Sequence, residues 1–83
     1  MNQSFEEMMA ELNAQMDAEL TVIKLAVDEI TINYKFIQMC ENIYLIDFKD
    51  GDEYNKATKV VNSQPGKYQA RYHDKAKRIS IIF

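Results

Sequence analysis

The most regular alternation of apolar and polar residues in this chain lies between residues 30 and 37. Every second residue there is apolar, in the order Ile30, Ile32, Tyr34 and Phe36. A period of two is typical of a half-buried β-strand, because successive side chains leave opposite faces. A second apolar run, at residues 43–48, follows within reach of an antiparallel return. We therefore predict strands at 30–37 and 43–48, and we place both in the middle of a sheet.

Apolar residues at three- and four-residue steps predict an amphipathic helix over residues 4–19. This apolar stripe consists of Phe5, Met8, Met9, Leu12, Met16 and Leu20. Ser4 followed by Glu7 fits a capping box at the start of the helix. Half of the stripe is methionine, a residue that fills gaps in cores and also adapts to varied partners. We expect these methionines to pack where the helix crosses the sheet.

The remaining elements follow from shorter patterns. Residues 21–27 are rich in β-branched side chains and predict a strand, although a helix that continues from Leu20 is the alternative. After the Asp50-Gly51 turn, apolar spacing favours a short helix at about 52–61, with Asp52 as its cap. Strands at 67–73 and 78–83 form a hairpin around a polar four-residue link. The predicted fold is α+β: an N-terminal helix on an antiparallel sheet of about five strands, with a second helix before a C-terminal hairpin.

Composition limits the size of the domain and the cellular compartments in which it would be found. A chain of 83 residues, 47% of them hydrophobic, predicts a single small domain with a real core. One cysteine excludes an intrachain disulfide, which suits a reducing compartment. The sequence lacks the roughly 18 consecutive apolar residues of a membrane span, and its acidic start differs from a secretory signal. We expect a cytoplasmic protein that does not enter a membrane.

Catalytic and metal-binding patterns are weak throughout the sequence. Cys40 and His73 are the only residues of their kinds, and neither lies in a motif that would bring the two together. We expect Cys40 to be a half-buried apolar residue and His73 to face solvent. The acids around Gly51 do not follow the spacing of a calcium loop. The sequence therefore predicts no enzyme, no metal site and no cofactor.

The net charge of -3 hides a strong asymmetry along the chain. Residues 1–53 carry twelve acids and three bases, whereas residues 54–83 carry one acid and seven bases. We expect a small non-catalytic protein-binding module, an inhibitor, adaptor or regulatory subunit, whose acidic face meets a basic partner surface. A phage or mobile element would be a fitting source. Residues assigned to the acidic face are Glu6, Glu7, Glu11, Asp17, Asp47, Asp50, Asp52 and Glu53. The same asymmetry leaves head-to-tail homodimerisation open.

Two alternatives come from the C-terminal hairpin, where bases alternate with tyrosines, a mixture that suits nucleic acid. The residues of this alternative site are Lys67, Arg71, Lys75, Lys77 and Arg78. Residues 67–83, with Tyr-x-Ala-Arg-Tyr, a charged turn and Arg-Ile-Ser-Ile-Ile, also resemble the closing hairpin of bacterial ribosome-dependent ribonuclease toxins. This resemblance implies a small nuclease-like toxin. The acidic, helix-first beginning differs from the basic, strand-first beginning of those toxins, so we assign no family and carry over no residue roles.

Overall fold

The computed structural model describes residues 5–83, apart from the side chains of residues 5 and 9–13. The elements follow in the order α1 (Phe5–Asp28), β1 (Tyr34–Cys40), β2 (Ile43–Phe48), α2 (Gly51–Ser63), β3 (Gln69–His73) and β4 (Arg78–Ile82). The predicted α+β class is confirmed, with four antiparallel strands in place of about five. The cap expected at Ser4 lies outside the described residues.

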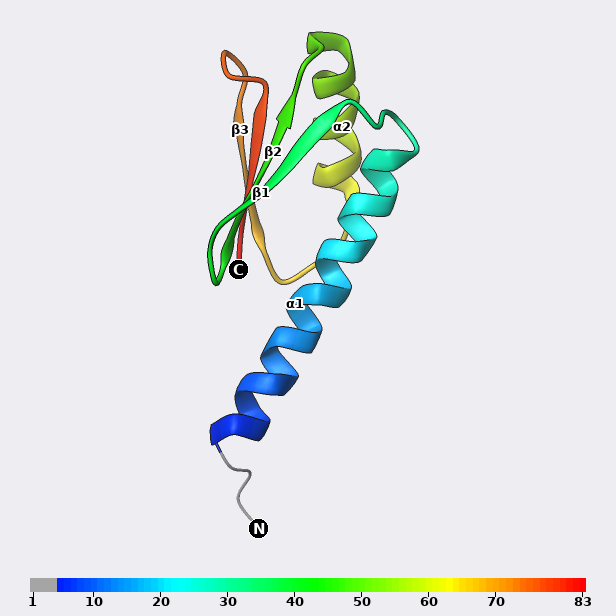
Figure 1. Cartoon of the computed structure of the whole chain (residues 1–83). Helices are drawn as coiled ribbons and strands as arrows, with labels where there is room; N and C mark the ends of the chain where they lie inside the picture. The colour runs from blue at the N-terminus through cyan, green and yellow to red at the C-terminus, as the bar shows by residue number, and fades with distance from the viewer. Residues whose placement is uncertain (1–4) are drawn as a thin grey trace.

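The sheet consists of two hairpins joined side by side. Its strand order is β1-β2-β4-β3, so β2 and β4 are central and β1 and β3 are the edges. Both helices lie on one face of this sheet (Figure 1). The placement of residues 43–48 in the middle of the sheet is therefore right, and the placement of residues 30–37 there is wrong, because β1 pairs with one neighbour only.

The predicted strand at 21–27 is a correction, because α1 continues through this segment to Asp28. Leu20, Ile23 and Val27 follow each other at three- and four-residue steps and are 8%, 1% and 0% exposed. Burial of one helix face supplies most of the stability of a helix in a protein, so it outweighs the weak preference of β-branched residues for strands. The alternative of a continuous helix is the correct one.

The segment just before β1 is also different from the prediction, because residues 30–33 end the helix rather than begin the strand. The amides of Ile30 and Thr31 both donate to the Val27 carbonyl oxygen, at 2.9 and 3.0 Å. The Thr31 hydroxyl then accepts the Asn33 amide at 2.9 Å. Ile32, expected on the buried side, is 81% exposed. The alternation at residues 30–33 therefore reflects a turn, and the strand begins at Tyr34.

The core lies between the helices and the sheet face that they cover. Buried side chains from α1, α2, β2 and β4 form it, with half-buried aromatic residues around them. The Phe48 ring packs between Tyr34 and Tyr54, at centroid distances of 5.9 and 6.0 Å. Tyr54 is 2% exposed, and its hydroxyl donates to Asp74 Oδ1 at 2.8 Å. This hydrogen bond ties α2 to the turn between β3 and β4.

The second helix and the C-terminal hairpin agree with the sequence analysis. α2 lies where a helix was predicted, at 52–61. Its cap is Asp50 rather than Asp52, because the Asp50 carboxylate accepts the Glu53 amide at 3.0 Å. β3 and β4 lie within the strands predicted at 67–73 and 78–83. Lys77, in the link between them, has a positive φ of 54°.

Candidate functional site

The first candidate surface is the N-terminal half of α1. This helix extends beyond the sheet that its C-terminal half covers (Figure 1). Glu19 Oε1 accepts the Lys67 amide at 3.0 Å and so joins the middle of α1 to the loop before β3. The residues before Glu19, 5–18, continue past the end of the sheet (Figure 1). We call this segment the arm. At 1.5 Å per residue it is about 20 Å long, and it accounts for the elongated shape of the molecule, 51 × 21 × 18 Å.

The arm presents apolar and acidic side chains together. Met8 is 49% exposed and Met16 is half-buried, whereas Glu6 and Asp17 are exposed. In the sequence, the spacing of the buried residues Leu20, Ile23 and Val27 continues back to Phe5. The expected packing of the methionines across the sheet is therefore wrong for Met8, and Met9 lies outside the described side chains.

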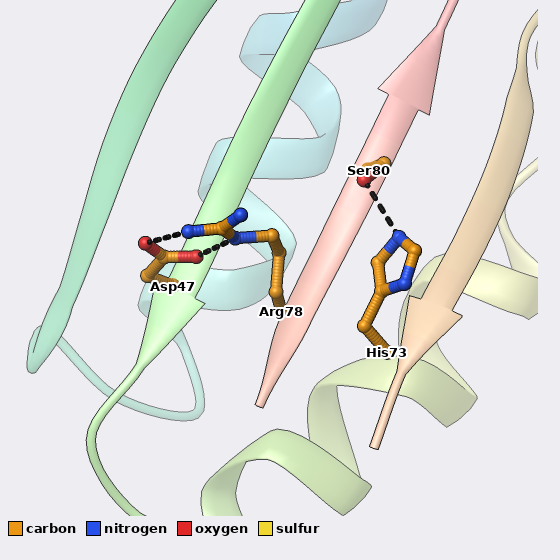
Figure 2. Close-up of polar contacts among 4 residues, drawn as sticks. All are labelled: Asp47, His73, Arg78 and Ser80. Carbon is orange, nitrogen blue, oxygen red and sulfur yellow. Dashed lines mark hydrogen bonds and ion pairs between the residues drawn. The ribbon is translucent and has the colours of Figure 1, made fainter. Parts of the chain in front are cut away.

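The second candidate surface is the side of the sheet that faces away from both helices, which we call the open face. One row across it contains Lys35, Asp47, Arg78 and His73, and the next contains Ile37, Leu45, Ser80 and Arg71. Figure 2 shows Asp47, Arg78 and Ser80 on the two central strands and His73 on the edge strand β3. The first of these rows is polar throughout, whereas the second combines Ile37 and Leu45 with Ser80 and Arg71.

Charges in the centre of the open face cancel each other. Arg78 donates through Nε to Asp47 Oδ1 at 2.5 Å and through Nη2 to Asp47 Oδ2 at 3.0 Å, a two-pronged pair (Figure 2). This guanidinium lowers the pKa of the Asp47 carboxyl below its ordinary value. Two bases of the open face, Lys35 and Arg71, lie outside this pair, on the two edge strands.

His73 and Ser80 form the second polar contact of the open face, with His73 Nε2 3.1 Å from Ser80 Oγ (Figure 2). Nucleophilic catalysis by such a pair needs a third group that orients the histidine. Among the residues that the structure describes, no carboxylate is hydrogen-bonded to His73. Ser80 is also only 7% exposed, on a central strand. We therefore interpret this contact as part of the sheet surface.

Cys40 and His73 are far apart in the sheet. Cys40 pairs with Ile43 at one end of edge strand β1, whereas His73 pairs with Arg78 at the opposite end of the other edge strand. Cys40 is exposed rather than half-buried, because it ends the edge strand at a tight turn, where its Sγ lies 3.2 Å from Asn42 Oδ1. Across the described part of the chain, no three His, Cys, Asp or Glu side chains gather as metal ligands would.

The predicted acidic residues lie in three places. Glu6, Glu7 and Asp17 belong to the arm, and the side chain of Glu11 is outside the described set. The group Asp50, Asp52 and Glu53 opens α2, at the end of the molecule opposite the arm (Figure 1). Asp47 is paired with Arg78 on the open face. The structure thus does not bring the whole set onto one surface.

The predicted basic residues are divided as well. Arg78 is paired, and Lys77 Nζ donates to the Lys49 carbonyl oxygen at 3.3 Å. Lys67 precedes β3, Lys75 lies in the turn after it, and Arg71 faces outward from the strand between them. The arm and the apolar residues of the open face are the features that sequence reasoning missed. The unusually long apolar stripe, from Phe5 to Val27, was the signal for the first of them.

Comparison with protein-family models, curated protein sequences and solved structures gives no match for this chain. Among its described helices, none combines the length and the apolar character that crossing a bilayer requires.

Proposed function

We propose that this protein is a small non-catalytic protein-binding module, an inhibitor, adaptor or regulatory subunit, that docks through the arm. The observation that carries the proposal is that α1 continues past the end of the sheet that its C-terminal half covers (Figure 1). Leu20, Ile23 and Val27 are at most 8% exposed, whereas Met8 in the arm is 49% exposed on the same helix. An amphipathic helix that extends past its own domain is typical of helix-in-groove recognition.

The chemistry of the arm indicates what kind of surface it fits. Its apolar side chains favour an apolar groove, and methionine adapts to grooves of different shape. Glu6, Glu7 and Asp17 favour a groove whose edges are basic, because opposite charges speed the encounter and exclude wrong partners. We therefore propose a protein target with a basic, partly apolar surface, which corresponds to the acidic face expected from the sequence but restricts it to the arm.

The proposal is tested by capture from cell lysate with two matched variants. In the first, Met8→Lys and Met16→Lys place charge on the arm and retain good helix formers. In the second, Val22→Lys and Leu25→Lys make the same change in the packed half of α1, at positions that are 50% and 61% exposed. We expect the wild-type protein and the second variant to retain the same proteins, and the first variant to lose them.

Equal retention by both variants would contradict the arm as the docking element. Melting curves of the two variants provide the control, since both should unfold near the wild-type temperature. A repeat at high salt should weaken retention, because the charges at the edges of a contact are screened.

A further inference from the structure

The open face of the sheet has the properties that the arm requires of a target. Apolar residues form its floor: Leu45 is 8% exposed, Ile37 is 39% exposed, and Ile43 and Ile82 are half-buried beside them. Ile43 and Ile82 are direct cross-strand partners, as are Ile37 and Leu45, so the floor is continuous over three strands.

Basic residues stand at both edges of this floor. Lys35 on β1 and Arg71 on β3 are exposed and belong to the two edge strands. Four strands at about 4.8 Å spacing separate these edges by roughly 14 Å, so a helix of about 20 Å that lies across the strands can reach both edges. The face therefore combines an apolar floor with a cation on each of its two edge strands.

The arm carries the complementary pattern. Lys24 Nζ lies 5.6 Å from the Phe36 ring centroid, so the side of α1 that carries Lys24 borders its packed face. Glu6 lies on the same side of the helix, because it precedes Lys24 by about five helical turns. Asp17 directly follows the half-buried Met16 and is exposed on that flank. Acids thus border the apolar side of the arm.

We infer that the partner of the arm is a second copy of this chain, and that each arm lies across the open face of the other copy in a two-fold dimer. The inference rests on the proposed function, since both need the arm as a docking element. A two-fold arrangement closes on itself and uses both surfaces of each copy. It therefore doubles the buried area, toward the roughly 1,600 Å² of a stable interface. A basic target would compete with the open face for the same arm.

Pairing of two arms with each other is the main alternative, and its charges oppose it. Residues 5–18 contain four acids and no base, so two arms side by side would bring like charges together. The open face instead offers Lys35 and Arg71 to Glu6 and Asp17. Charge complementarity thus favours the arm on the sheet over the arm on the arm.

Sedimentation velocity of the purified protein, over a range of concentrations at low salt, tests the dimer. We expect reversal of the arm acids (Glu6→Lys, Asp17→Lys) or of the edge bases (Lys35→Glu, Arg71→Glu) to weaken dimerisation about tenfold or more. All four changes in one chain should restore it. The control, Lys59→Glu with Lys75→Glu, changes charge equally outside the open face and should leave the dimer intact. If the four changes together fail to restore a dimer that each pair weakens, the inference is overturned.

The exposed Cys40 gives a direct view of the contact, because it lies at one end of the open face. A spin label on Cys40 of one copy should broaden the amide signals of residues 6–17 in an isotope-labelled Cys40→Ser copy. A dimer without this broadening would overturn the arm-on-sheet contact. If the protein is a monomer at every concentration, a second copy is not the partner of the arm. The proposed function would still stand in that case if the Met8 and Met16 variant lost the proteins that the wild type captures.

Discussion

Asp47 and Arg78 show how a neighbour across the sheet decides the role of a charged residue. In the sequence, Asp47 belongs to an acidic region and Arg78 to a basic hairpin. The pairing of β2 with β4 places them side by side, and each then neutralises the other. The sequence did not reveal this contact because it joins segments that are distant along the chain. The open face consequently has its cations at its edges rather than at its centre.

Asp47→Asn should lower the melting temperature by a few degrees at neutral pH, because Arg78 loses its carboxylate and the pair is partly exposed. The pKa of Asp47 is lowered in the folded state, so the pair stabilises the fold above the ordinary carboxyl pKa of about 4. This contribution disappears as the pH falls through the lowered pKa. Melting curves of the wild type and the variant should therefore converge in acid, and a constant difference down to the lowest pH would contradict the pair.

Tyr54 should make the protein sensitive to alkali. Burial and the nearby Asp74 carboxylate raise the pKa of its hydroxyl from 10.0 to about 12. The unfolded chain then ionises before the folded one, so stability is complete below 10.0 and falls as the pH rises toward 12. Denaturant midpoints across this range should fall more steeply for the wild type than for Tyr54→Phe. Equal slopes would show that Tyr54 does not contribute.

At the scale of elements, α1 is where sequence and structure differ most. The predicted helix ended at residue 19 because Thr21, Val22 and Ile23 favour strands locally, yet Ile23 is buried against the core and holds the helix together. Local preference is a weak signal where tertiary burial is available. In the last hairpin, Tyr68 and Tyr72 alternate with polar residues, and both pack against the core, as a period of two requires of one face of a strand.

The two halves of α1 should respond differently to truncation of a side chain. Ile23→Ala removes a side chain that is 1% exposed and should lower the free energy of unfolding by about 2–4 kcal/mol. Met8→Ala, in the arm, should change it by less than about 0.5 kcal/mol at concentrations where the chain is monomeric. Urea unfolding measures both, and a comparable loss for Met8→Ala would show that the arm packs within its own domain.

At the scale of the whole molecule, the sequence predicted the types of element in the fold better than their arrangement in space. The α+β class, β2, α2 and the C-terminal hairpin could be predicted because each has a strong local pattern. The strand order could not, because the pairing of β2 with β4 depends on contacts between distant segments. The charge asymmetry of the sequence was real, but folding divided the acids of the predicted face among the arm, the start of α2 and the Asp47–Arg78 pair.

The central claim is that α1 is one helix whose C-terminal half packs on its own domain, whereas the arm extends past the sheet. Residue-resolved amide hydrogen exchange tests it most directly, at low and at high protein concentration. We expect strong protection from about Leu20 to Val27 at both concentrations, and protection of residues 6–17 that appears only as the concentration rises. Equal protection along all of α1 in the dilute monomer would contradict the account.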